Sequence, residues 1–149
     1  MGFSPDGRYL YHTDTQRRTI YQYAYDATTG ALGIRSTFVT VEDGVGVPDG
    51  LTIDAEGCVW SARWNGGCVV RYDSDGSELL RIDFLVPKFS SVRFGGPEHE
   101  HLYVTTAGGG ARGVEGPQAG ALFRVQGVGV RGVPEHRSRV AIPRRQLGQ

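Results

Sequence analysis

The residue best placed to do chemistry is Asp49, in the turn Pro48-Asp49-Gly50. Pro48 fixes its own φ angle and pushes Val47 toward extended geometry, so the turn forms a stiff corner where a strand begins. Gly50 allows the backbone to pass close to whatever Asp49 holds. A carboxylate in this position can bind a hard cation or act as a general base, and it can also do no more than cap the turn.

Other polar clusters have simpler interpretations. The segment Glu98-His99-Glu100-His101 looks like a metal-binding cluster, but alternate residues of a strand-turn-strand point apart, so we predict a solvated hairpin tip. The run Gly108-Gly109-Gly110 is not expected to cradle phosphate, because no helix is predicted after it and no Lys-Ser/Thr pair closes it. Asp6, Asp54 and Asp75 lie in turns and are most simply turn formers.

The elements that position these residues repeat along the chain. Strand-turn-strand patterns occupy residues 3–11, 53–60 and 94–103, and their first residues lie 50 and then 41 positions apart. Third strands are predicted at 19–25, 67–72 and 120–125, and fourth strands at 34–41 and 78–84. A period of roughly 40–50 residues with four short strands per unit is typical of propeller blades. The sequence therefore predicts an all-β fold of about three four-stranded blades.

Composition agrees with this fold and excludes some functions. The chain has 23 glycines and 7 prolines in 149 residues, and they fall at regular turns between apolar strands. Lys plus Arg and Asp plus Glu balance at 16 each, which argues against a nucleic-acid or anionic-membrane partner. No stretch is apolar enough to span a membrane, and no secretory leader is visible on the sequence as given.

The two cysteines, Cys58 and Cys68, are not expected to form a disulfide. Asn65-Gly66 is a hairpin signal that places Arg63 opposite Cys68, so Cys58 lies five residues further down the strand. At the usual rise of a strand the two thiols are about 15 Å apart, beyond bridging distance. We therefore expect a reducing, cytoplasmic location.

In order and spacing, these motifs resemble the C-terminal half of the regucalcin (senescence marker protein)/gluconolactonase family. Members of that family are six-bladed propellers that hydrolyse sugar lactones with one bound divalent metal. The resemblance covers nearly all of the chain. It rests on Phe3–Gly7, Pro48–Gly50 with Ile53–Gly57 and Trp60, Asn65–Gly67, Phe94–Gly96, Leu102–Thr105, Ala119–Phe123 and Gly127–Gly132.

The resemblance implies that Asp49 is a metal ligand and takes a proton from the attacking water. The family's other ligands, an Asn and a Glu, would fall upstream of Met1, with the Asn two residues before it. The implied cofactor is one divalent ion, Ca²⁺, Mg²⁺, Mn²⁺ or Zn²⁺, which this chain alone would hold weakly. We therefore expect a lactonase half that is inactive by itself. The alternative is a non-catalytic half-propeller that binds or assembles.

The resemblance also suggests where a sugar lactone would bind. Ser90 stands four residues before Phe94, as Asp49 stands four before Ile53, so Ser90 is expected at the same channel mouth. Its hydroxyl would bond water or substrate, or cap its turn. Arg63 is a candidate for the pocket lining, and Asn65 is either a turn residue or a substrate contact.

Three further expectations concern organisation. The Gly-rich loop Ala107–Gly120 is a candidate lid on the same face. Residues 1–135 are expected to form the partial propeller and residues 136–149 a tail that can fray. Three blades do not close a ring, so we expect self-association through the open blade edges.

Overall fold

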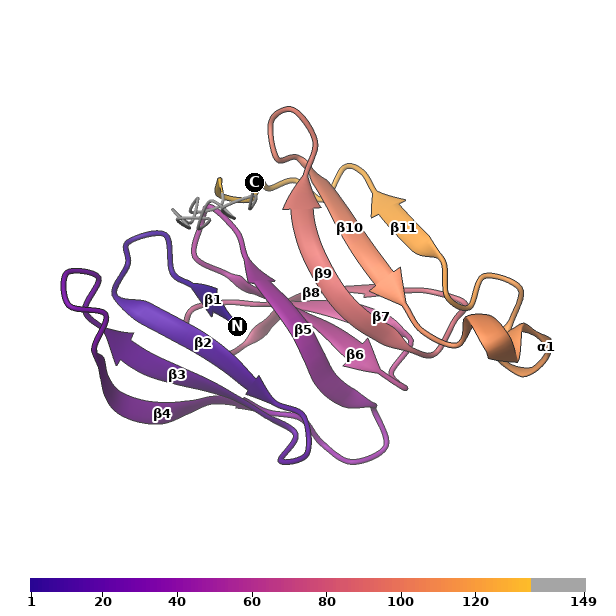
Figure 1. Ribbon diagram of the computed structural model, residues 1–149, viewed down its shortest axis with the longest axis horizontal. Helices are drawn as coiled ribbons and strands as arrows, with labels where there is room; N and C mark the ends of the chain where they lie inside the picture. The colour runs from indigo at the N-terminus through magenta and orange to yellow at the C-terminus, as the bar shows by residue number, and fades with distance from the viewer. Residues whose placement is uncertain (135–149) are drawn as a thin grey trace, which may run out of the picture.

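The computed structural model describes residues 1–134, which form three antiparallel sheets arranged side by side as blades (Figure 1). Blade 1 contains β1 (Gly2–Phe3), β2 (Tyr9–Asp14), β3 (Thr19–Tyr25) and β4 (Leu32–Thr40). Blade 2 contains β5 (Val47–Ile53), β6 (Val59–Trp64), β7 (Cys68–Tyr72) and β8 (Glu78–Asp83). Blade 3 contains β9 (Phe89–Gly95), β10 (His101–Thr106) and β11 (Leu122–Val125).

The predicted all-β architecture is confirmed, with three differences of detail. Blade 3 has three strands within the described residues, not four, and β11 begins at Leu122. The loop between β10 and β11 contains the 3₁₀ helix η1 (Gly109–Ala111) and the α-helix α1 (Arg112–Glu115). The prediction that no helix follows the glycine run was therefore wrong, because a four-residue helix is too short to show a helical hydrophobic period. The predicted tail at 136–149 lies outside the described residues.

The inner strands of blade 2 are covered on both faces, and this explains why β6 and β7 are buried at nearly every position. One core, between blades 1 and 2, includes Tyr11, Ile20 and Val70. The other, between blades 2 and 3, includes Trp60 and Phe94, whose ring centroids lie 5.6 Å apart edge to face. All residues of β6 except Trp64 are buried, so β6 lacks the alternation expected of a strand with one wet face.

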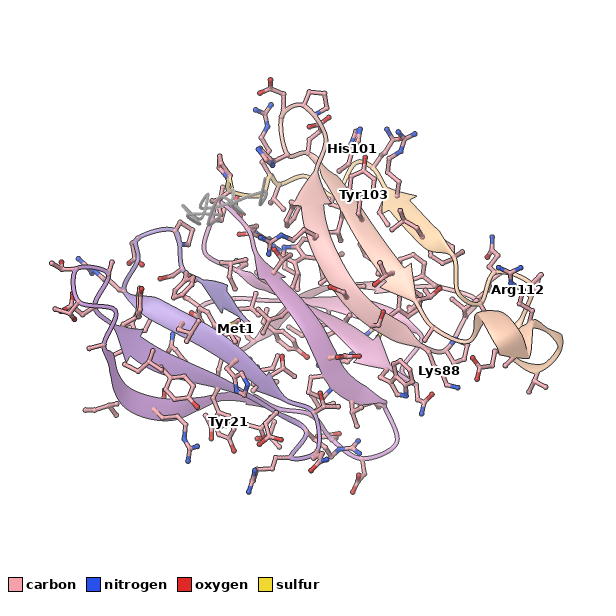
Figure 2. All side chains as sticks on the ribbon, in the orientation of Figure 1. Met1, Tyr21, Lys88, His101, Tyr103 and Arg112 are labelled. Atoms are coloured by element: carbon pink, nitrogen blue, oxygen red, sulfur yellow. The ribbon has the colours of Figure 1, made fainter. Side chains whose placement is uncertain are left out.

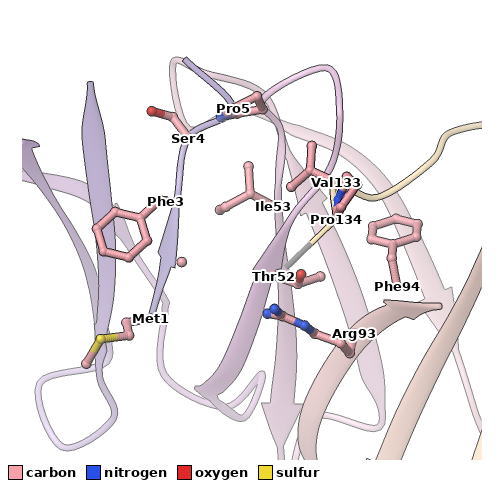
Figure 3. Close-up of a pocket in the computed structure, with 11 residues that line it drawn as sticks. Met1, Phe3, Ser4, Pro5, Thr52, Ile53, Arg93, Phe94, Val133 and Pro134 are labelled. Carbon is pink, nitrogen blue, oxygen red and sulfur yellow. The ribbon is translucent and has the colours of Figure 1, made fainter. Parts of the chain in front are cut away.

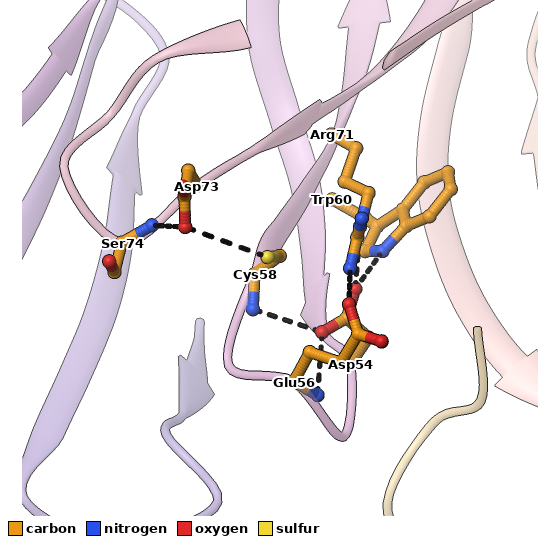
Figure 4. A network of polar contacts seen from close by, with 7 residues as sticks. All are labelled: Asp54, Glu56, Cys58, Trp60, Arg71, Asp73 and Ser74. Atoms are coloured by element: carbon orange, nitrogen blue, oxygen red, sulfur yellow. Dashed lines mark hydrogen bonds and ion pairs between the residues drawn. The ribbon is translucent and has the colours of Figure 1, made fainter. Parts of the chain in front are cut away.

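Asp54 is the polar centre of blade 2 (Figure 4). Its carboxylate is completely buried and accepts hydrogen bonds from the backbone N–H groups of Glu56 and Cys58, both at 3.0 Å. It also accepts bonds from Trp60 Nε1 at 2.9 Å and from Arg71 Nε at 2.8 Å. Asp54 does form its turn, as predicted. It also joins the turn to β6 and β7, because Trp60 and Arg71 reach it from these two strands.

Both cysteines are free and buried, which agrees with the prediction of no disulfide. No helix among residues 1–134 is long and apolar enough to cross a membrane.

Replacing Asp54 should lower the stability far more than replacing another turn aspartate. Asp54→Ala leaves the Trp60 N–H without its acceptor and leaves Arg71 paired only with the exposed Glu56 carboxylate. We therefore expect the free energy of unfolding to fall by about 3–5 kcal/mol. Asp75→Ala is the matched control, since Asp75 only bonds the backbone and hydroxyl of Ser77 in an exposed turn. Urea denaturation of both variants measures the difference. Equal losses would show that Asp54 is no more than a turn former.

Candidate functional site

Asp49 lies on a β-bulge in β5. Pro48 pairs with Arg63 and Leu51 pairs with Ser61, so Asp49 and Gly50 together oppose only Ala62 of β6. Such a two-against-one bulge bends its strand and changes the direction in which a side chain points, and bulges are common beside active sites. The bulge therefore explains how the Asp49 side chain can point in a direction that regular strand pairing would not allow.

Gly50 brings this bulge into backbone contact with blade 3. A Cβ placed on Gly50 would lie 2.6 Å from Ser90 O and 2.7 Å from Ser91 Cα, closer than real Cβ atoms approach. β5 and β9 run side by side in the same direction (Figure 1), so Asp49 and Ser90 lie near the starts of neighbouring innermost strands. The structure thus brings two of the predicted site residues to the same end of the molecule.

The environment of Asp49 suits a ligand or a base better than a turn cap. Its side chain is half-buried, and burial raises the pKa of the carboxyl group. Within residues 1–134 the carboxylate has no hydrogen-bond or ion-pair partner, so a cation would offset its desolvation. The same residues contain no group of three or more His, Cys, Asp or Glu that could hold a metal. Asp49 therefore fits as one ligand of a hard cation, not as a complete site.

The other predicted contacts differ in accessibility. The Ser90 hydroxyl lies 2.9 Å from Thr105 Oγ1, so it has a protein partner and is also partly exposed. Asn65 is exposed and adopts a φ angle of 58°, which places it at the turn between β6 and β7.

Arg63 is only 3% exposed, and its guanidinium lies in the interior between blades 1 and 2. It is hydrogen-bonded to the Tyr72 hydroxyl and lies over the Tyr72 ring, 5.5 Å from the centroid. Its Nη1 is buried without a partner among the described residues, and burial lowers the pKa of the guanidinium to about 10. In this structure Arg63 contributes to the site through its backbone, which pairs with Pro48 beside the bulge.

The hairpin tip Glu98–His101 lies at the opposite end of blade 3 from Ser90. The backbone N–H of Glu98 donates to Glu100 Oε2 at 2.8 Å, and the Glu98 carboxylate pairs with Arg131 at 3.3 Å. His99 has a φ angle of 55° and forms the corner of the turn.

A cavity of about 260 Å³ opens between the innermost strands, away from Asp49 (Figure 3). It is lined by β1, by Thr52 and Ile53 at the far end of β5, and by Arg93 and Phe94 of β9. The Arg93 side chain points toward Thr52, and burial lowers its pKa. This cavity belongs to the end of the channel opposite the bulge.

Sequence reasoning missed Lys88 and Glu115, which form an ion pair beside the site. Lys88 stands two residues before Ser90, and this proximity was the available signal. Glu115 lies 25 residues beyond Ser90 in a loop, and no local pattern connects it to Lys88.

Gly50→Ala tests the contact between β5 and β9. The added methyl group would press on the backbone of Ser90 and Ser91, so we expect roughly 1–3 kcal/mol less stability in a urea melt. Gly113→Ala is the control, because nothing lies within 4 Å of the added atom and Ala favours the short helix α1. A Gly50→Ala variant as stable as the control would mean that the two strands are not held in contact.

Two arginines of blade 2, the buried Arg63 and the partly buried Arg71, should respond oppositely to removal of their charge. Arg63→Met removes a buried charge that has no carboxylate partner, so the free energy of unfolding at neutral pH should stay within about 1 kcal/mol or rise. Arg71→Met should cost about 3–5 kcal/mol, because it leaves the Asp54 carboxylate buried without its cation. Urea melts of both proteins give the comparison. A large loss for Arg63→Met would show that its charge is compensated.

Comparison with known proteins identifies relatives of this chain. A profile described as the SMP-30/Gluconolactonase/LRE-like region matches residues 1–108. The chain is 50% identical over 149 residues to pentonolactonase XacC of Haloferax volcanii, covering 95% of this chain and 51% of that protein. It is 34% identical over 140 residues to regucalcin of Bos taurus, covering 91% and 47%.

Comparison with solved structures identifies relatives of the same family. The structure matches the calcium-binding protein regucalcin from Agrobacterium tumefaciens with a TM-score of 0.85 and 35% identity, over 93% of this chain and 48% of that one. It matches a gluconolactonase from Xanthomonas campestris with a TM-score of 0.60 and 34% identity, over 70% and 33%. The chain spans about half the length of the curated relatives it matches. Its blades correspond to part of a six-bladed propeller.

Proposed function

Because the chain belongs to the SMP-30/gluconolactonase/LRE-like family, we propose that it forms part of a metal-dependent sugar lactonase in which Asp49 is a metal ligand. The observation that carries this proposal is the half-buried Asp49 carboxylate, held on a bulge without a protein partner among residues 1–134. A structural aspartate in the same strand-turn unit, Asp54, has four hydrogen bonds instead. The names of the relatives, pentonolactonase and gluconolactonase, support a sugar lactone as the substrate class.

The proposed roles follow from the positions of the side chains. A divalent cation, when bound, would polarise the lactone carbonyl and stabilise the developing oxyanion. Asp49 would hold that cation and would accept a proton from the attacking water. The partly exposed Ser90 hydroxyl would bond a water or a substrate hydroxyl in exchange for Thr105. Asn65 offers an exposed amide at the same end of blade 2, whereas Arg63 acts indirectly through the strand pairing.

A single carboxylate binds a divalent cation weakly. Ca²⁺, Mg²⁺, Mn²⁺ and Zn²⁺ all accept oxygen ligands, so Asp49 does not select among them. We therefore infer that residues 1–134 require further ligands from elsewhere, and that the 149-residue chain alone hydrolyses lactones at the background rate.

The alternative is a non-catalytic fragment that acts by assembly. The observation in its favour is the outer edge of β11, which has no neighbouring strand among the described residues. An unpaired edge is a template for pairing with another chain.

A chimera tests whether this sequence supports lactonase activity once the other half of a propeller is supplied. The matching half of the Haloferax volcanii pentonolactonase is replaced by this chain, and hydrolysis of a pentonolactone is followed with a pH indicator while metal binding is followed by calorimetry. We expect the chimera to be active with added divalent metal. Asp49→Asn in the chimera should reduce kcat/KM at least about a hundredfold and abolish saturable metal binding, because the charged ligand is lost.

The matched control is Asp75→Asn, which changes an exposed turn aspartate and should leave activity and metal binding unchanged. Activity that survives Asp49→Asn would show that Asp49 is not the ligand. Tight one-site metal binding with turnover by the 149-residue chain alone would instead contradict the requirement for further ligands.

A further inference from the structure

The segment from Ala107 to Gly120 is a compact loop whose two ends meet. The N–H of Gly120 donates to Ala107 O at 3.0 Å, and the N–H of Ala107 donates to Lys88 O at 3.0 Å. The loop contains η1 and α1, and Val114 at its tip is 91% exposed. A surface loop with joined ends and little buried apolar area is a unit that can open without unfolding the sheets.

One ion pair holds the inner side of this loop. Glu115 pairs with Nζ of Lys88, and their side chains are only 13% and 27% exposed. The second carboxylate oxygen of Glu115 is buried without a hydrogen-bond partner among the described residues. It lies against Gly108, where a Cβ would collide with it. The closed position is therefore stabilised by a partly buried ion pair and penalised by an unsatisfied oxygen, which water would satisfy if the loop opened.

The ion pair lies at the Asp49 end of the molecule. Lys88 directly precedes β9, two residues before Ser90, and its Nζ lies 5.7 Å from the ring centroid of Trp64. Trp64 in turn pairs with Val47, two residues before Asp49. Figure 2 shows Lys88 and Arg112 at the end of blades 2 and 3 where β10 leaves its sheet.

We propose that residues 107–120 form a lid beside the Asp49 mouth, and that the Glu115–Lys88 ion pair is its latch. When the latch is closed, the Lys88 ammonium covers the Trp64 ring. When it opens, Glu115 becomes solvated, and the Lys88 ammonium beside the Trp64 ring loses its carboxylate partner and becomes available to a ligand. An aromatic ring beside a cation is suited to a polyhydroxylated ligand. That choice of ligand rests on the proposed lactonase function, whereas the opening of the lid does not.

Proteolysis after Arg112 reports on the opening. Arg112 Nε donates to Ala119 O at 3.1 Å within the loop, and a protease needs the surrounding chain extended, so cleavage requires the lid to open. The 149-residue protein is treated with trypsin, and cleavage of the 112–113 bond is followed by mass spectrometry. Glu115→Gln should accelerate this cleavage about tenfold, since it removes a charged hydrogen bond from the closed state. Glu98→Gln is the matched control, because it breaks an exposed ion pair at the other end of blade 3.

Two further measurements separate a lid from a generally weakened protein. Lys88→Met should accelerate cleavage as Glu115→Gln does, and the double variant should add nothing, because both changes remove the same interaction. The cleavage rate of each protein should be nearly independent of urea below the unfolding transition, since local opening exposes little surface. Unchanged cleavage in Glu115→Gln, equal acceleration by Glu98→Gln, or a urea dependence equal to that of global unfolding would overturn the proposal. None of these readouts requires metal or lactone, so they fail independently of the lactonase proposal.

Discussion

The burial of blade 2 on both faces is the constraint on which the candidate site depends. Blades 1 and 3 pack against opposite faces of β5–β7, and the aromatic contacts Tyr11–Phe38–Tyr72 and Trp60–Phe94 lie in the two interfaces. A sheet enclosed in this way cannot shift its register without moving apolar side chains out of both cores. The extra residue at Asp49-Gly50 is therefore fixed in place. Gly50 lies against the backbone of Ser90 and Ser91, where blade 3 packs on blade 2.

Asp49 and Asp54 lie five residues apart in the same strand-turn unit, but their carboxylates have different environments. Asp54 is fully buried and has hydrogen bonds to two backbone N–H groups, an indole and a guanidinium, so its charge is compensated within the fold. Asp49 is half-buried and uncompensated among the described residues, and burial raises its pKa. Burying an uncompensated carboxylate lowers the stability of the fold, so Asp49 is a candidate for binding a ligand that would compensate its charge.

The sequence was sufficient for the strands and the blades, because turns and apolar strands are local signals that recur at a regular spacing. It also predicted the opposition of Arg63 and Cys68, which agrees with the pairing of Ala62 with Val69. The sequence did not predict that the Arg63 side chain points into the interior. In a strand buried on both faces every position is apolar or enclosed, so the alternation that normally separates inside from outside is lost. Asp54 was similarly indistinguishable from Asp6 and Asp75, because all three occupy similar turns and only the tertiary partners Trp60 and Arg71 set Asp54 apart.

Some features of the candidate site are determined by residues close to Asp49 in sequence, and others by residues far from it. The position of Asp49 is determined within about fifteen residues, by Pro48, by the bulge against Ala62 and by the absence of a side chain at Gly50. The coordination shell of a metal, by contrast, is assembled from residues that are distant in sequence, and residues 1–134 contain no group of three or more His, Cys, Asp or Glu that could hold one. The contacts beside Asp49 are also non-local, since Lys88 meets Glu115 across 27 residues and meets Trp64 only where blades 2 and 3 pack together. A change in the packing of these two blades would therefore alter the position of the Asp49 bulge and the Trp64–Lys88 contact together, even though no residue of the site had been replaced.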